Sequence, residues 1–164
     1  MDTPLVSIRI ATSDDCPAIL EIFKSWQPND WDRKLAERYY NAVFSGEKCF
    51  TEDMVFVLQS ANKVVGTIGY SSDRFEAANL YWLGWFYVHS AFKEQGHGKF
   101  LLNFALDELR EIRCRKLYVT TGSDEFYLPA RRLYERAGFF AESVLHDYYG
   151  HGVNQLIYGK TLTK

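Results

Sequence analysis

Residues 88–102 run VHSAFKEQGHGKFLL and join a strand pattern to a helix pattern. Before them, residues 80–88 form an aromatic, β-rich run. After them, apolar residues recur at helical spacing to about Arg113. At a tight turn between a strand and a helix, the unpaired N–H groups of the first helical turn and the positive end of the helix dipole point outward together. Such a turn can bind phosphate, and glycines at 96 and 98 let the main chain approach an anion closely.

The turn also carries three basic or titratable side chains, Lys93, His97 and Lys99. They add positive charge around a bound anion. The spacing Gly-x-Gly alone leaves an ordinary tight turn as the alternative. The chain lacks the phosphate-loop motif Gly-x-x-x-x-Gly-Lys-Ser/Thr, and residues 96–98 lack the third glycine of a dinucleotide-binding fingerprint.

The rest of the chain supplies alternating helices and strands around this turn. Strand patterns cover residues 5–11, 54–58, 63–70, 80–88, 117–121, 139–145 and 156–162, and helix patterns cover 15–25, 32–44, 98–113 and 129–137. The helix over 98–113 is expected to bury Phe100, Leu101, Phe104, Ala105, Leu109 and Ile112. The order β-α-α-β-β-β-α-β-α-β-β predicts a mixed α+β fold with one parallel crossover over residues 80–121.

Composition narrows the class of protein. The 164 residues fit one domain, 1–164, and they are 47% hydrophobic, 16% aromatic and 24% charged. The net charge of −2 gives no global field for nucleic acid or an anionic membrane. Cys16, Cys49 and Cys114 lie far apart with no metal-ligand spacing, so we expect reduced thiols, no metal site and a cytoplasmic protein. No secretion signal or membrane span is expected.

A second motif, later in the chain, indicates what the glycine turn binds. Residues 130–139, ARRLYERAGF, resemble the signature Ala-x-x-Leu-Tyr-Glu-x-x-Gly-Phe of the GCN5-related N-acetyltransferases (GNAT). Residues 93–98 resemble the acetyl-CoA loop of the same family, Arg/Gln-x-x-Gly-x-Gly/Ala. This chain departs from the family at Ser90, Lys93, His97 and Tyr127. The resemblance implies a GNAT-like α+β fold with about four helices and a mostly antiparallel central sheet that contains a splayed parallel strand pair.

The resemblance also implies which residues bind acetyl-CoA. Its pyrophosphate would lie on the main-chain N–H groups of the loop, and its pantetheine arm would pair like a strand with the end of the 80–88 run, which in this family splays from its parallel neighbour. The implied cofactor-binding residues are Phe86, Tyr87, Val88, Lys93, Glu94, Gln95, Gly96, His97, Gly98 and Lys99.

Tyr134 matches the family's tyrosine near the cofactor sulfur, so the resemblance implies that its phenol supplies a proton to the departing thiolate; a core aromatic is the alternative. Asp147, Tyr148 and Tyr149 resemble an acceptor-side loop between the last two strands, where a hairpin turn with surface aromatics is the alternative. Trp26 and Trp31 would form the opposite wall or anchor the core. For the general base, the candidates Asp124, Glu125, His89 and Asp147 remain alternatives to ordered water.

The sequence therefore predicts an acetyl-CoA-dependent N-acetyltransferase that acts on a primary amine of a small molecule or peptide by direct attack in a ternary complex. A catalytically silent acyl-CoA sensor or regulatory protein is the alternative. The sequence leaves open the acceptor, the use of acyl groups other than acetyl, and a homodimer.

Overall fold

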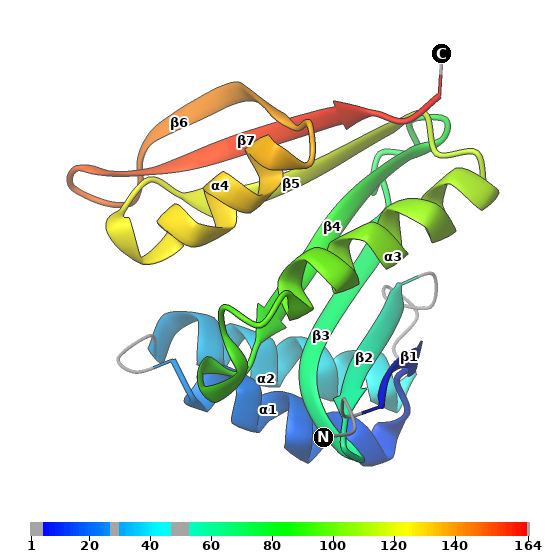
Figure 1. Ribbon diagram of the computed structural model, residues 1–164. Helices are drawn as coiled ribbons and strands as arrows, with labels where there is room; N and C mark the ends of the chain where they lie inside the picture. Colours follow the sequence, from blue (N-terminus) through cyan, green and yellow to red (C-terminus); the bar gives the residue numbers. More distant parts are fainter. Residues whose placement is uncertain (1–4, 27–29, 47–52, 164) are drawn as a thin grey trace. The chain divides into compact units, whose positions relative to one another are not determined.

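The computed structural model describes residues 5–26, 30–46 and 53–163 (Figure 1). The chain divides into two compact units. Unit 1 comprises Met1–Ser71 and Gly84–Ala105, and unit 2 comprises Ser72–Leu83 and Leu106–Lys164. The single-domain organisation expected from the length stays a prediction.

The order of helices and strands is the one that the sequence predicted, which confirms the mixed α/β class. The elements are β1 (Val6–Ile10), α1 (Cys16–Lys24), α2 (Asp30–Ser45), β2 (Met54–Ser60), β3 (Lys63–Ser72), β4 (Leu80–Val88), α3 (His97–Glu111), β5 (Lys116–Gly122), α4 (Leu128–Arg136), β6 (Phe140–Gly150) and β7 (Val153–Thr161). Among the described residues the strands follow the order β1-β2-β3-β4-β5-β7-β6, and β4 and β5 are the parallel pair. No described helix has the length and apolar character needed to cross a bilayer.

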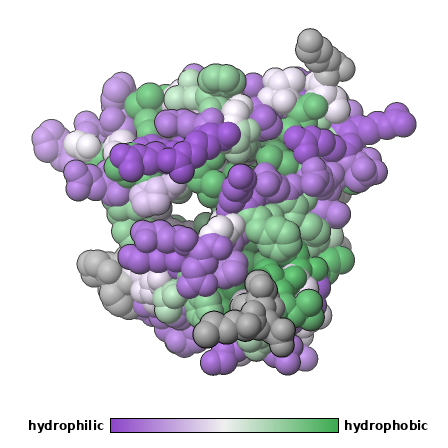
Figure 2. Space-filling model, viewed as in Figure 1, coloured by the Kyte–Doolittle hydropathy of each residue, from purple (hydrophilic) through white to green (hydrophobic). Residues whose placement is uncertain are grey.

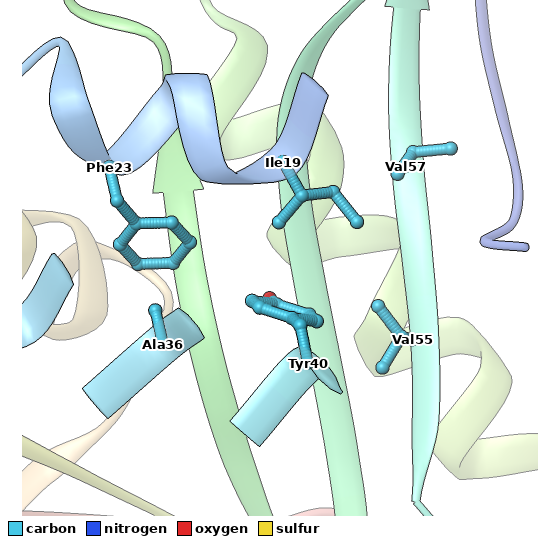
Figure 3. Packing of buried hydrophobic residues seen from close by; sticks show 6 residues of the cluster. All are labelled: Ile19, Phe23, Ala36, Tyr40, Val55 and Val57. Atoms are coloured by element: carbon cyan, nitrogen blue, oxygen red, sulfur yellow. The ribbon is translucent and has the colours of Figure 1, made fainter. Parts of the chain in front are cut away.

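In unit 1, α1 and α2 pack against each other and over strands β2 and β3 (Figure 1). The β2–β3 turn uses Ala61 and Asn62 at φ 49° and 63°, the left-handed geometry that matches the twist of a hairpin. Figure 3 shows the buried cluster that results, made of Ile19, Phe23, Ala36, Tyr40, Val55 and Val57. Tyr40 is completely buried. Its hydroxyl group forms a hydrogen bond with Thr67 Oγ1 at 3.3 Å, so the buried phenol has a polar partner inside the apolar core.

In unit 2, β6 and β7 form an antiparallel hairpin beside β5, and residues Leu80–Leu83 of β4 pair in parallel with Lys116–Val119. Helix α4 lies alongside β5 and β7 (Figure 1). It ends at Arg136, and Gly138 just beyond it has a φ of 82°, which suits glycine. Cys114 is buried, and burial raises the pKa of its thiol to about 11, so it behaves as a core residue. Cys16 is half-buried, and Cys49 lies outside the described residues.

One part of the predicted core of α3 is wrong. Phe100 and Ile112 are 47% and 42% exposed, whereas Leu102 and Leu106 are buried. The buried face therefore follows the row Leu101, Leu102, Ala105, Leu106 and Leu109. Apolar residues occur on more than one side of this helix, and only one side is packed into the core. The surface in Figure 2 shows polar and apolar side chains intermixed over the face viewed.

A partly buried ion pair lies at the junction between β1 and α1. Arg9 donates from Nη1 to Asp15 Oδ2 and from Nη2 to Asp15 Oδ1, both at 2.7 Å, and the Thr12 N–H donates to the same carboxylate at 2.8 Å. These hydrogen bonds, with that from Arg9 the largest contribution, lower the pKa of Asp15. The side chain of Asp15 is 8% exposed.

Asp15→Asn is expected to lower the free energy of unfolding at neutral pH by about 2 kcal/mol, because two charge-assisted hydrogen bonds are lost. Since the pKa of Asp15 is depressed on folding, its stabilisation is present above the unfolded-state pKa of about 3.9 and is lost as the pH falls through the folded-state value. Urea unfolding at several pH values measures this difference. The exposed neighbour variant Asp14→Asn is the control, and equal stabilities of the two variants at neutral pH would contradict the role of the pair.

Candidate active site

The last residues of β4 form the strand that was expected to bind the pantetheine arm. Trp85 has a φ of 41°, which is unusual for a bulky residue inside a strand and marks a local distortion. The His89 N–H donates to the Val65 carbonyl at 2.8 Å, on the side of β3. Because main-chain groups of alternate residues point to opposite edges of a strand, the groups of Phe86 and Val88 point away from β3. Phe86, Tyr87 and Val88 are half-buried.

The expected phosphate loop follows β4 in unit 1. A short 3-10 helix (Ser90–Phe92) leads from β4 into this loop, and α3 begins at His97. Glu94 and Gly96 take left-handed φ values of 62° and 83°, and a Cβ built on Gly96 would meet no atom within 4 Å. In the described part of the chain, no hydrogen-bond acceptor contacts the N–H groups of residues 94–99, while the Phe100 N–H already donates to the Gly96 carbonyl.

His97 differs from the other loop residues because it points inward. It is 8% exposed, and its Nε2 atom has no hydrogen-bond partner among the described residues. The ring centroid of Phe92 lies 6.4 Å from that of His97. Lys93, Glu94, Gln95, Gly96 and Lys99 are exposed, and Gly98 is half-buried. The loop therefore combines uncommitted main-chain donors, open space above Gly96 and an uncommitted imidazole nitrogen, which together suit a phosphate group.

The two tryptophans of the predicted acceptor wall have different positions. Trp26 follows α1, and its indole N–H donates to the Val88 carbonyl at 2.7 Å. It therefore contacts the β4 edge that faces away from β3, where the pantetheine arm was expected to pair. Ser25 Oγ accepts the Ser90 N–H at 2.9 Å, so the end of α1 is attached to the start of the loop. Trp31 lies in α2, and its side chain lies outside the described residues.

An aromatic and carboxylate group beside β4 was not predicted from the sequence. The ring centroid of Phe23 lies 4.6 Å from that of Tyr87 and 5.6 Å from that of Trp85. The Tyr87 hydroxyl donates to Asp32 Oδ2 on α2. Tyr39 makes a similar contact, since its hydroxyl donates to Asp53 Oδ2 at 2.8 Å. The high aromatic content is evident from the sequence. The two tyrosine–aspartate hydrogen bonds are not, because they join residues that are 55 and 14 positions apart and no sequence pattern marks them.

Tyr134 lies on α4 in unit 2 and is 4% exposed. Its ring centroid lies 5.7 Å from that of Phe139 and 6.1 Å from that of Tyr158. Burial raises the pKa of the Tyr134 phenol well above its ordinary range, so the phenol stays protonated at any physiological pH. Neighbouring Tyr158 donates its hydroxyl to Glu135 Oε1 at 2.9 Å.

The predicted acceptor-side loop is placed differently in the structure. Asp147, Tyr148 and Tyr149 lie within β6, and the segment joining β6 to β7 is 151–152. The Asp147 carboxylate accepts the Gly152 N–H at 2.7 Å, and its own N–H donates to Asn154 Oδ1 at 3.0 Å. The left-handed φ of 54° at Asp147 accompanies an irregular register between Leu145 and Gly150. The prediction ended the strand too early because the irregularity interrupts its alternating pattern.

The four candidate bases differ in what their polar atoms already contact. His89 Nδ1 accepts the Ala91 N–H at 3.2 Å, and the Asp147 carboxylate holds the β6–β7 turn. Glu125 is exposed. Asp124 Oδ1 is buried and has no hydrogen-bond partner among the described residues, and the same is true of Thr121 Oγ1 in the same unit. Among the described residues, no group of His, Cys, Asp and Glu side chains is arranged to hold a metal ion.

Comparisons with known proteins agree on one fold. A GNAT-family protein from Desulfovibrio desulfuricans is 24% identical, with a TM-score of 0.86 over 97% of this chain and 100% of that chain. The ribosomal-protein-S18-alanine N-acetyltransferase of Escherichia coli is 20% identical, with a TM-score of 0.79 over 98% and 96%. The YncA protein of Salmonella typhimurium, solved with its cofactor acetyl-CoA, is 21% identical, with a TM-score of 0.72 over 97% and 95%.

The sequence comparisons identify the family. A search of curated proteins finds no match. The family model described as "Acetyltransferase (GNAT) family" matches residues 16–139, which include the glycine loop and the motif around Tyr134. The resemblance noted in the sequence is thereby confirmed, and the chain belongs to the GNAT family of acetyltransferases.

Proposed function

We propose that the protein transfers the acetyl group of acetyl-CoA to a primary amine of a small molecule or peptide, by direct attack of the amine in a ternary complex. The observation that carries the proposal is the loop 93–99. Its N–H groups at 94–99 contact no acceptor in the described chain, and its Gly96 leaves open space. Acetyl-CoA, the acetyl donor of the family, brings a thioester carbon that an uncharged amine can attack.

Three parts of unit 1 support binding of the donor. The loop N–H groups would hold the pyrophosphate at the N-terminus of α3, with Lys93 and Lys99 adding charge. His97 Nε2, which is buried without a partner among the described residues, would donate a hydrogen bond to the same pyrophosphate. The Phe86 and Val88 main-chain groups would pair with the pantetheine amides. The Val88 carbonyl already accepts a hydrogen bond from the Trp26 indole, which would either remain or be replaced by a hydrogen bond from the pantetheine arm.

Residues of unit 2 supply the proton chemistry of the proposal. Tyr134 would hold a proton at its Oη and give it to the departing thiolate. Its raised pKa keeps that proton in place at physiological pH. Asp124 is the favoured acceptor of the proton that the amine loses, because its Oδ1 is buried and has no hydrogen-bond partner among the described residues. Asp147, Tyr148 and Tyr149 remain candidates for acceptor contact through their exposed side chains, and Trp26 and Trp31 remain candidates in unit 1. The cytoplasmic location stays a prediction.

Turnover against a diverse amine panel tests the proposal. The purified chain is mixed with acetyl-CoA and each amine in turn. The released coenzyme A thiol is measured, and the mass of the product is determined by mass spectrometry. Coenzyme A release with an acetylated amine as product is the expected result. Thermal stabilisation by acetyl-CoA without release above background for any amine would replace the proposal with a silent acyl-CoA sensor.

Asp124→Asn is expected to lower kcat/KM for the acceptor at least tenfold, about 1.4 kcal/mol, because the amide keeps the shape but does not accept a proton. The matched control is Glu125→Gln, which removes the adjacent, exposed carboxylate. Equal kcat/KM for the two variants would exclude Asp124 as the base.

A further inference from the structure

The segment that joins β5 to α4 carries Asp124, the proposed base, and lies wholly within unit 2 (Figure 1). Strand β5 ends at Gly122, and a short 3-10 helix, Glu125–Tyr127, precedes α4. Ser123 and Asp124, between them, belong to no helix or strand. The main-chain groups of this turn, residues 122–124, therefore take hydrogen-bond partners from other parts of the unit.

Arg131, near the start of α4, supplies two of these partners. Its Nη1 atom donates to the Gly122 carbonyl and to the Asp124 carbonyl, both at 2.6 Å. The arginine side chain is half-buried. Hydrogen bonds from a charged donor are stronger than those from a neutral donor, and the planar guanidinium presents its donors in a rigid geometry. One arginine therefore fixes both carbonyls relative to α4.

The residue between the two carbonyls is fixed from β7. The Ser123 N–H donates to the Asn154 carbonyl at 2.9 Å, and Ser123 Oγ accepts the Asn154 N–H at 2.8 Å. All three residues of the turn are therefore hydrogen-bonded to a neighbouring element, two of them to α4 and one to β7.

The Asp124 carboxylate has one oxygen to spare within this turn. Its Oδ1 atom is buried and has no hydrogen-bond partner among the described residues. A Cβ built on Gly122 would lie 3.2 Å from Asp124 Oδ2 and 2.6 Å from Cδ2 of Tyr127, so glycine at this position leaves room for both side chains. The position of the carboxylate thus depends on the main chain of the turn, which Arg131 holds.

We propose that Arg131 is a positioning residue of the acetyl transfer, which holds the Asp124 carboxylate in place by fixing the carbonyls of Gly122 and Asp124. This inference rests on the proposed function, in which Asp124 takes the proton of the acceptor amine. A general base must lie within hydrogen-bond reach of that proton, and a displacement of about 1 Å can lower the rate about a hundredfold. Arg131 acts on the reaction through the main chain of the turn.

Steady-state kinetics of Arg131→Gln, with the best amine from the panel, tests the proposal. We expect kcat/KM for the acceptor to fall about tenfold, with the KM for acetyl-CoA unchanged, because a shorter and uncharged amide cannot hold both carbonyls. The matched control is Arg132→Gln, which removes the adjacent, exposed guanidinium from the same helix and should leave the rate unchanged. Equal rates for the two variants would overturn the proposal.

A double-mutant cycle with Asp124→Asn shows whether Arg131 acts through Asp124. If it does, adding Arg131→Gln to Asp124→Asn should lower kcat/KM by less than about twofold further, because the carboxylate that Arg131 positions is already gone. Two independent tenfold losses, about a hundredfold together, would give Arg131 a role separate from Asp124 and would overturn the proposal.

Amide hydrogen exchange separates this proposal from the proposed function. The Ser123 N–H, protected by its hydrogen bond to Asn154, should exchange at least tenfold faster in Arg131→Gln than in Arg132→Gln. Equal exchange would show that Arg131 does not fix the turn, even in an active enzyme. Faster exchange in a chain that acetylates no amine would reject the proposed function and, with it, the role of Arg131 in the transfer. If Arg131→Gln lowers the folded fraction by circular dichroism, Arg131→Lys replaces it in all three measurements.

Discussion

Gly96→Val is expected to raise the dissociation constant for acetyl-CoA about a hundredfold, equivalent to about 2.7 kcal/mol. Gly96 has a φ of 83°, in the left-handed region, where a residue with a Cβ atom costs about 1–2 kcal/mol and a β-branched residue is a clear outlier. The substituted loop would relax by rotating its N–H groups away from the position of the phosphate. The new side chain would also fill the open space above residue 96.

Titration calorimetry with acetyl-CoA measures this change, and Gly152→Val separates binding from backbone strain. Gly152 has a φ of 80°, and a Cβ built on it also meets no atom within 4 Å, but it lies in the β6–β7 turn of unit 2. Both variants should lose similar stability in urea, while Gly152→Val should bind acetyl-CoA as the wild type does. Equal affinities of the two variants would show that the loop is not the phosphate site.

The glycine loop was predictable because its determinants are local. The left-handed φ at Gly96 and the start of α3 at His97 follow from the residue types in a short window. The order of elements was predictable for the same reason, since each strand and helix carries its own periodicity. Comparison with known families then gave these local patterns a common function.

The parts that sequence reasoning missed depend on contacts between distant residues. The pattern did not identify Val88 as the acceptor for Trp26, and the two are 62 residues apart. The exposure of Phe100 depended on which side of α3 the sheet covers. The extension of β6 through Asp147 depended on Asn154 and Gly152 in the partner strand and turn. In each case tertiary hydrogen bonding or packing outweighed the local pattern.

Tyr134→Phe is expected to lower kcat at least tenfold, about 1.4 kcal/mol of barrier, with little change in the KM for acetyl-CoA. The substitution removes one hydroxyl group and keeps the ring, so the contacts of Tyr134 with Phe139 and Tyr158 persist. The raised pKa of the phenol means that the proton is present throughout the working pH range, as a general acid requires. An effect confined to kcat would identify an interaction made only in the transition state.

Tyr158→Phe is the matched control, because it removes a phenol from the same aromatic group whose hydroxyl donates to Glu135. Steady-state kinetics with the best amine from the panel should give near wild-type turnover for this variant. The pH profile adds a second readout. Because the pKa of Tyr134 is raised, ionisation of this group cannot produce an alkaline limb below its unfolded-state pKa of about 10. If both variants turn over as the wild type does, Tyr134 is a core aromatic and the thiolate takes its proton from water.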